Sequence, residues 1–358
     1  MSPIPLAGLE AMRGIVDRLA SPDFGVDEFF DPPERIRELL AKLVGGEAAA
    51  FSLTGSASFG MATLAWNLRV AANELVGERR RIVGLDGQFP SNVQPWRRLE
   101  GAGFEFELVP GGEGATDRLL EAIDERTALV ALGPLAWTDG RRIDVGALGR
   151  RAADCGALYS LDVTQSSGVD ASLPDDLQCD LVVGAGYKWL LGPYGTGFMR
   201  LSSELQERLE PLEANWKNFA RSDDFNRLND YRPDFYSPAA RFDHGESSAF
   251  VRLAGWEAAL LTLIEIGPAN VAEHALSFGK ALAEGLDGER FEISAVEAAD
   301  QATHLFRVAP RDSDQFESLS LALGAAGVSV SQRDGGWRIS PHVYNNGADI
   351  ERFLQVLS

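Results

Sequence analysis

Short apolar segments alternate with longer helical patterns between residues 80 and 200, and this alternation restricts the fold more than any other feature. The strand-like segments are RIVGL (81–85), FEFELV (104–109), ALVALG (128–133), ALYSLDV (157–163) and DLVVGAG (180–186). Strands that alternate with helices such as 141–155 are typical of βαβ units, so we predict an α/β fold with a mostly parallel sheet flanked by helices. A strand at 195–201 follows too closely for a crossover helix, and we expect it to pair antiparallel.

The chain is 358 residues long, which exceeds what one compact core usually holds, so we expect two domains. Residues 211–248 are rich in Asn, Asp, Arg and Pro and are typical of a long irregular loop, a feature that is often functional. We predict an N-terminal segment (1–20) that packs on the small domain, and a large domain over 21–252. A smaller α+β domain over 253–358 would begin with a connecting helix.

Charge and cysteine content argue against several classes of protein. With 33 basic and 53 acidic residues the net charge is −20, which repels nucleic acid and anionic lipid as general partners. No window approaches 18 apolar residues, and the N-terminus lacks a cationic start before an apolar run, so we expect no membrane association, no signal peptide and a cytoplasmic location. Cys155 and Cys179 lie in neither a CxxC motif nor a Cys/His cluster, so we expect no metal site and no disulfide framework.

Several chemically useful side chains follow the predicted strands, where ligands bind in open α/β sheets. Asp162 and Gln165 follow one strand, Lys188 follows the next, Phe89 follows 81–85, and Ser56 lies in a turn before an apolar helix. Each has an ordinary explanation, such as a helix cap, core packing or a salt bridge. Together they offer a Schiff-base lysine, a carboxylate for a pyridinium proton, a flat side chain to cover a ring and backbone amides for a phosphate. A pyridoxal phosphate site needs these parts.

The most specific pattern is LDVTQSSG, which contains Asp162, followed by GAGYKWLLGPYGTGF, which contains Lys188. Through it the chain resembles the class V aminotransferase family of pyridoxal phosphate enzymes, from roughly residue 30 to the C-terminus. That family also includes cysteine desulfurases, selenocysteine lyases, kynureninase and isopenicillin N epimerase-like proteins. The resemblance implies a fold type I architecture, with a mostly parallel large-domain sheet and a smaller α+β C-terminal domain, and pyridoxal 5'-phosphate as cofactor.

The resemblance also implies a role for individual residues. Lys188 would form the Schiff base with the cofactor, and Asp162 would pair with the pyridine nitrogen. Gln165 would donate a hydrogen bond to the phenolic oxygen, and Phe89 stands where many relatives place a histidine that stacks on the ring. The implied phosphate contacts are Ser56, the amide of Ala57, and Tyr187.

The resemblance suggests three further contacts in other segments. Arg338 in WRISPHVYNNG matches the arginine that binds the substrate α-carboxylate, and a salt bridge on an edge strand is the alternative. Trp137 could border the substrate or belong to the core. The segment RFDHGESSAF (241–250) resembles one that reaches across a dimer interface toward the partner's phosphate, which implies a homodimer with Ser247 as the contact; a plain loop is the alternative.

Two departures from the family pattern narrow the expected chemistry. The loop before Arg338 holds no cysteine, whereas desulfurases and selenocysteine lyases have a nucleophilic cysteine there, so we do not expect persulfide chemistry. Phe89 replaces the histidine that serves acid–base work in those enzymes, which leaves proton transfer mainly to Lys188. We expect aminotransferase-type chemistry on an α-amino acid or related small amine, with a lyase or epimerase reaction as the alternative. The third possibility is a catalytically silent member of the family that binds only cofactor or partner proteins.

Overall fold

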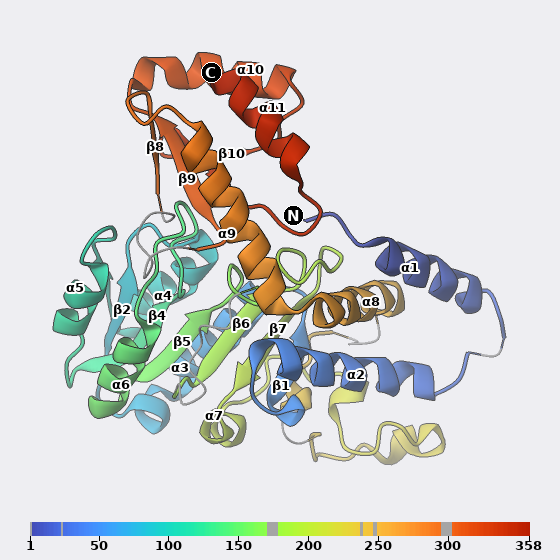
Figure 1. Ribbon diagram of the computed structural model, residues 1–358. Helices are drawn as coiled ribbons and strands as arrows, with labels where there is room; N and C mark the ends of the chain where they lie inside the picture. The colour runs from blue at the N-terminus through green and yellow to red at the C-terminus, as the bar shows by residue number, and fades with distance from the viewer. Residues whose placement is uncertain (1, 23, 170–177, 237–238, 246–248, 295–302) are drawn as a thin grey trace. The chain divides into compact units, whose positions relative to one another are not determined.

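The computed structural model describes residues 2–22, 24–169, 178–236, 239–245, 249–294 and 303–358 (Figure 1). Contacts divide the chain into two compact units. The first unit consists of Met1–Pro134 and Asp144–Ile266, and the second of Leu135–Ile143 and Gly267–Ser358. Within the described residues, no helix is both long enough and apolar enough to cross a membrane.

A seven-stranded sheet forms the centre of the first unit among the described residues, in the order β1-β7-β6-β5-β4-β2-β3. The strands are β1 (Phe51–Thr54), β2 (Arg81–Leu85), β3 (Glu105–Val109), β4 (Thr127–Leu132), β5 (Leu158–Asp162), β6 (Leu181–Ala185) and β7 (Gly197–Leu201). Strands β3, β2, β4, β5 and β6 pair parallel, and β7 pairs antiparallel with both β6 and β1. The predicted mostly parallel sheet and its antiparallel strand are therefore confirmed.

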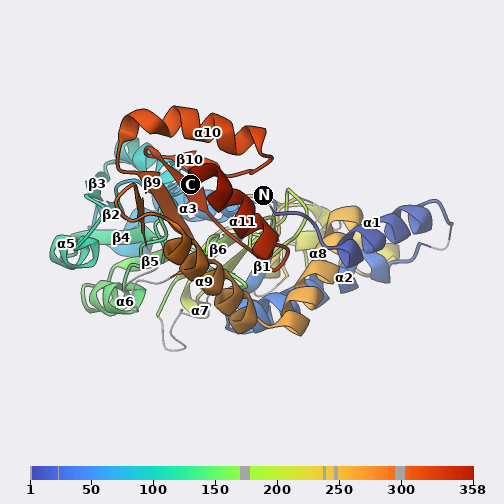
Figure 2. The ribbon, with the colours of Figure 1, turned by 45° about the horizontal axis from the view of Figure 1, so that its top comes forward.

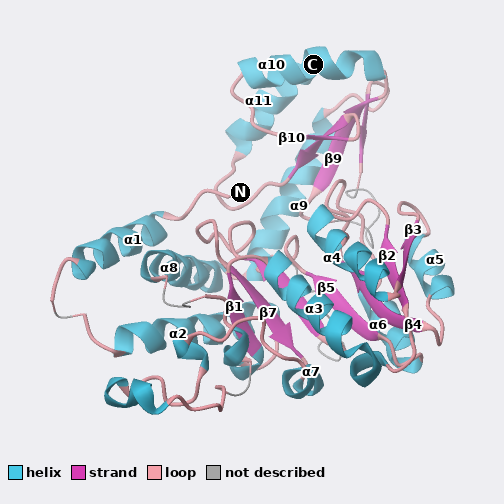
Figure 3. Cartoon of the chain, turned by 180° about the vertical axis from the view of Figure 1, so that it is seen from behind, coloured by secondary structure: helices cyan, strands magenta, loops and turns pink. Residues whose placement is uncertain are grey.

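Helices cover both faces of this sheet (Figures 1 and 3). The α-helices described in the first unit are α1 (Leu6–Leu19), α2 (Asp27–Val44), α3 (Ala57–Val76), α4 (Gln94–Arg97), α5 (Ala115–Ala122), α6 (Val145–Asp154), α7 (Ser203–Arg208) and α8 (Phe250–Ile266). Helix α3 packs on one face, where Gly60 allows close contact with Val183 and Met199. On the other face the Tyr159 hydroxyl of β5 donates to the Val145 carbonyl of α6 at 3.0 Å. The buried apolar side chains between α3 and the sheet form a hydrophobic core of the first unit.

The observed division differs from the boundaries that we predicted. Helix α8 belongs to the first unit, because its Trp256 is buried against Gly186 and Gly192 of the segment after β6. Helix α1 packs along α8 through Gly8 and Gly255, so residues 1–20 also fall in the first unit. Residues 135–143, which lie inside the predicted large domain, belong to the second unit instead.

The second unit contains a four-stranded antiparallel sheet in the described residues, in the order β10-β11-β9-β8. Its elements are α9 (Pro268–Gly285), β8 (Phe291–Ile293), β9 (Phe306–Pro310), α10 (Phe316–Ala325), β10 (Ser331–Arg333), β11 (Gly336–Ile339) and α11 (Gly347–Leu357). Figure 2 shows α11 between α9 and α10. Trp337 and Phe306 point from the sheet into the core that these helices close. The predicted smaller α+β part is therefore confirmed.

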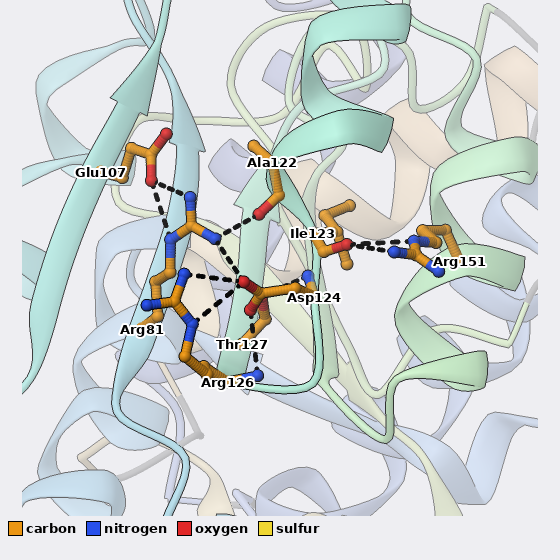
Figure 4. Close-up of polar contacts among 8 residues, drawn as sticks. All are labelled: Arg81, Glu107, Ala122, Ile123, Asp124, Arg126, Thr127 and Arg151. Atoms are coloured by element: carbon orange, nitrogen blue, oxygen red, sulfur yellow. Dashed lines mark hydrogen bonds and ion pairs between the residues drawn. The ribbon is translucent and has the colours of Figure 1, made fainter.

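A polar network holds the amino ends of β2 and β4 together (Figure 4). Arg81 donates to Glu107, to the Ala122 carbonyl at 2.6 Å and to Asp124 at 3.1 Å. A hydrogen bond from Arg126 is the main cause that lowers the pKa of the Asp124 carboxyl. The charged side chains at this amino-terminal edge of the sheet pair with one another. We therefore expect the reactive site at the opposite edge, at the carboxyl ends of the parallel strands.

Candidate active site

Two neighbouring parallel strands bring Asp162 and Lys188 to the same edge of the sheet. Asp162 is the last residue of β5, and Lys188 follows the end of β6 at Ala185. The register pairs Asp162 with Val183, two residues before β6 ends at Ala185, so the carboxyl ends of both strands lie at the same edge of the sheet. The charge of Lys188 acts on the Asp162 carboxyl, which shows that the two side chains lie within electrostatic reach of each other.

Asp162 is a carboxylate held in an apolar setting. Burial raises the pKa of its carboxyl, and hydrogen bonds from Thr164 and the charge of Lys188 oppose that rise. The Thr164 amide donates to Oδ1 at 3.0 Å. Among the described residues, no cation lies within ion-pair distance of this carboxylate. A buried acid without an ion-pair partner suits a bound cation such as a pyridinium.

Phe89 lies beside the amine of Lys188. The Nζ atom is 5.3 Å from the centre of the Phe89 ring, a cation–π distance, and Phe89 is 41% exposed. The structure therefore brings together the three predicted side chains that would hold a cofactor ring: the lysine, the acid and the aromatic cover.

Glycines around Lys188 allow the loop to pack against α8. A Cβ atom at Gly186 would lie 2.4 Å from Thr196 Oγ1 and 2.7 Å from the Trp256 ring, and one at Gly192 would lie 2.5 Å from that ring. The loop is closed by a hydrogen bond from the Gly192 amide to the Gly186 carbonyl at 2.8 Å. Trp256 thus fixes the backbone that carries Lys188, a role that the sequence did not reveal.

Gln165 and Tyr187 are positioned by neighbouring aromatic residues. The Trp189 indole N–H donates to Gln165 Oε1 at 3.1 Å, which orients the amide. The Tyr187 and Tyr194 rings lie 4.5 Å apart, and burial raises the pKa of the Tyr187 phenol. Trp189 and Tyr194 are additional positioning residues. Both lie in the segment around Lys188, but no sequence pattern indicates their contacts.

The predicted phosphate turn is the N-terminus of α3. Ser56 is the N-cap residue, and its side chain makes no capping hydrogen bond, so the first amides of the helix remain available to an anion. The Thr54 hydroxyl donates to the Ser56 carbonyl at 2.9 Å. A Cβ at Gly197 would lie 2.9 Å from the Ser56 backbone, so this glycine lets β7 approach the turn. The Ser56–Ala57 backbone is thus held as a rigid cradle.

The irregular segment after residue 211 contacts the strand and the helix on either side of this turn. The His244 amide donates to the Leu53 carbonyl at 3.0 Å, and its ring lies 4.3 Å from the Phe59 ring of α3. Asp243 forms a buried ion pair with Arg37 of α2 and accepts from the Leu53 amide at 2.8 Å. Sequence reasoning missed this anchor. Ser247, our predicted phosphate contact, lies outside the described residues.

Breaking the buried ion pair should destabilise the first unit strongly. We expect Arg37→Met to lower the free energy of unfolding by about 3–5 kcal/mol, because Asp243 would remain buried without its cation. Arg35→Met on the same helix is the matched control; its pair with Glu257 has a half-exposed arginine, so we expect a loss below about 1 kcal/mol. Urea unfolding of both variants measures the difference. Equal losses would contradict a special role for the Arg37–Asp243 pair.

Arg338 and Trp137 lie together in the second unit. Arg338 Nη1 donates to the Trp137 carbonyl at 3.0 Å, and its guanidinium carbon is 5.8 Å from the centre of the indole ring. Burial, with the nearby charge of Arg333, lowers the pKa of Arg338 to about 10. The two predicted substrate contacts therefore adjoin each other. Within the described residues Arg338 forms no salt bridge, and its strand β11 lies between β10 and β9 rather than at the edge of the sheet.

Comparison with known proteins assigns the family. The model of the aminotransferase class-V family matches residues 25–353. The chain belongs to the class V aminotransferase family. Its predicted membership, its fold type I architecture and its nature as a pyridoxal phosphate enzyme are thereby confirmed. The Asp162 carboxyl, which forms no ion pair among the described residues, the adjacent lysine and the amide cradle before α3 fit this cofactor.

The individual relatives of this class V protein are named for different activities. A probable cysteine desulfurase of Methanothermobacter thermautotrophicus is 32% identical over 182 residues, which span 50% of this chain and 44% of that protein. The uncharacterized aminotransferase YcbU of Bacillus subtilis is 23% identical over 97% of this chain and 89% of its own length. The solved cystine C-S lyase C-DES, in complex with cysteine persulfide, has the same fold, with a TM-score of 0.82 at 18% identity over 99% of this chain and 94% of that one.

Proposed function

We propose that this class V enzyme carries out amino-group transfer from an α-amino acid or related amine, with Lys188 moving the proton at the substrate α-carbon. The observation that carries the proposal is the cluster at the carboxyl ends of β5 and β6. It combines the Lys188 amine, the buried Asp162 carboxyl on which its charge acts, and the Phe89 ring 5.3 Å from Nζ.

Each residue of the cluster would perform one task. Pyridoxal phosphate, when bound, supplies an electron-poor ring that stabilises negative charge at the substrate α-carbon. Asp162 would accept the hydrogen bond of the pyridinium N–H and so keep that nitrogen protonated. Lys188 would take the α-proton and deliver it to a second carbon, and Phe89 would cover the ring and exclude water. Arg338 would grip the substrate α-carboxylate through its planar guanidinium.

Neither cysteine is suited to act as a nucleophile on sulfur. Cys155 is buried, and burial raises the pKa of its thiol. Burial raises the pKa of the Cys179 thiol to about 12, so its thiolate is scarce at neutral pH. These properties support amino-group transfer over a desulfurase mechanism that uses an enzyme thiol, although one relative is named a probable cysteine desulfurase.

The fate of the amino group tests the proposal. When the loaded enzyme meets an amino donor without an acceptor, we expect about one keto product per active site and conversion of the bound cofactor to its amine form, because Lys188 completes only one half-reaction. Absorbance of the cofactor band and assay of the keto product measure both, and added keto acid should restore the starting spectrum. Continued release of ammonia and keto acid without an acceptor would contradict amino-group transfer.

A lyase or epimerase reaction is the second candidate. Its support is the shared fold with a cystine C-S lyase and the fact that the same cluster could serve loss of a β-substituent. Ammonia release that continues beyond one turnover would establish a lyase. Exchange of the α-proton with loss of optical purity, without keto product, would establish an epimerase.

A further inference from the structure

Three arginines share one face of the small sheet in the second unit. In the antiparallel register Arg338 of β11 pairs with Ser331 of β10 and with Arg307 of β9. Because side chains alternate along a strand, Arg333, two residues from Ser331, projects on the same face as these residues. Trp337, next to Arg338, occupies the opposite face and is fully buried in the core. The core therefore fixes this register and holds the arginines on the face away from it.

Only one of these three arginines has an acidic partner among the described residues. Arg307 pairs with Glu292 at 2.9 Å. Arg333 and Arg338 form no ion pair within the described part of the chain, and the Nε atom of each is buried without a hydrogen-bond partner. Their guanidinium carbons lie 5.0 and 5.8 Å from the centre of the same Trp137 ring.

Two neighbouring guanidiniums with unmet donors favour an anion. Each N–H that is buried without an acceptor costs free energy, and the two like charges repel each other. The planar fork of arginine matches a carboxylate in two parallel hydrogen bonds, so one carboxylate occupies one guanidinium well. If Arg338 takes the substrate α-carboxylate, as proposed above, the charge and donor of Arg333 remain for a second anionic group.

We propose that Arg333 is a specificity-determining residue that binds an anionic group on the substrate side chain, so that the enzyme acts on acidic amino acids. Arg338 binds the α-carboxylate, Arg333 binds the distal carboxylate or a similar anion, and Trp137 supports both guanidiniums with its ring. This inference rests on the role of Arg338 in the proposed function, and it goes beyond that function by naming the substrate class.

Binding of two unreactive acids to the loaded enzyme tests the inference. Succinate has two carboxylates, butyrate has one on a chain of the same length, and neither carries an amine that could react. We expect succinate to bind at least about tenfold more tightly than butyrate by isothermal titration calorimetry, the effect of one charge-assisted contact. Arg333→Gln should remove that preference and leave butyrate affinity within about threefold, since the α-carboxylate contact remains.

Two further variants separate the effect of the positive charge at position 333 from a general effect of removing an arginine from this unit. Arg333→Lys keeps the positive charge and should retain most of the succinate preference. Arg311→Gln removes one charge from an exposed position of the same unit and should change neither affinity. Equal binding of the two acids to the unmodified enzyme would overturn the inference, as would equal weakening of both acids by Arg333→Gln. Because neither acid reacts, these results are independent of whether amino-group transfer occurs at Lys188.

Discussion

Lys188→Ala is expected to lower turnover by about 10²- to 10⁴-fold, which is the contribution of a well-placed proton-transfer group. The structure explains this expectation, since the Lys188 amine is held beside Phe89 and within electrostatic reach of Asp162 by the loop that Gly186, Gly192 and Trp256 shape. The loss should fall mainly on kcat. A small external amine such as methylamine should restore part of the activity, because it can enter the space that the side chain leaves.

Covalent trapping of the cofactor provides a second test of the role of Lys188. Borohydride treatment of the loaded enzyme should fix the cofactor on the peptide that contains Lys188, as seen by mass spectrometry, and Lys188→Ala should show no such addition. Lys280→Ala is the matched control, because Lys280 is an exposed residue of α9. Turnover near that of the unmodified enzyme in Lys188→Ala, or borohydride fixation at another lysine, would contradict the assignment.

Local sequence patterns were sufficient for most of the sheet. Apolar runs predicted β2 to β6, and the short spacing before 195–201 predicted the antiparallel β7, but β1 (Phe51–Thr54) was not predicted. The end of β5 and the segment after β6 placed Asp162 and Lys188 correctly, because carboxyl ends of adjacent parallel strands meet at one edge. Such inferences need only periodicity and chain direction, which are local properties of the sequence.

Contacts between distant segments could not be predicted in this way. The Arg37–Asp243 pair joins α2 to the irregular segment, and Trp256 reaches the lysine loop from α8. Neither contact leaves a periodic signal, because each depends on how separate elements pack. The same limit explains why the predicted boundary groups α8 with the C-terminal domain, whereas its contacts place it in the first unit. The apolar pattern of α8 shows that it is buried, but not against which unit.

The arginines of the small sheet show a related limit. Arg307, Arg333 and Arg338 are equivalent in the sequence as cations on strand-like segments. The structure separates them, because Glu292 neutralises Arg307 while the other two meet at Trp137. An acid that pairs with a cation across a sheet is recognised only when the strand register is known.

Asp162→Asn should affect function and stability in opposite directions. We expect turnover to fall by about 10²- to 10³-fold, the usual loss when one group that stabilises developing charge is removed, because asparagine cannot keep the ring nitrogen protonated. The fold should persist, because asparagine has nearly the same shape and can still accept from the Thr164 amide. Steady-state kinetics with the amino donor that serves the unmodified enzyme measures the loss.

The stability effect follows from the raised pKa of Asp162. Burial, the largest cause, raises the carboxyl pKa in the folded protein without cofactor, so the folded state binds the proton more tightly than the unfolded state. Stability of the cofactor-free protein should therefore fall as pH rises through the folded pKa, and the cost should be fully present at neutral pH. Asp162→Asn removes this ionisation, so the cofactor-free variant should melt at a higher temperature at neutral pH and lose that pH dependence.

Added pyridoxal phosphate should then stabilise the variant less than the unmodified protein, because the acid that pairs with the ring nitrogen is gone. If the cofactor-free variant melts lower at neutral pH, or if the cofactor stabilises both proteins equally, Asp162 is not a buried acid kept for a cationic ring.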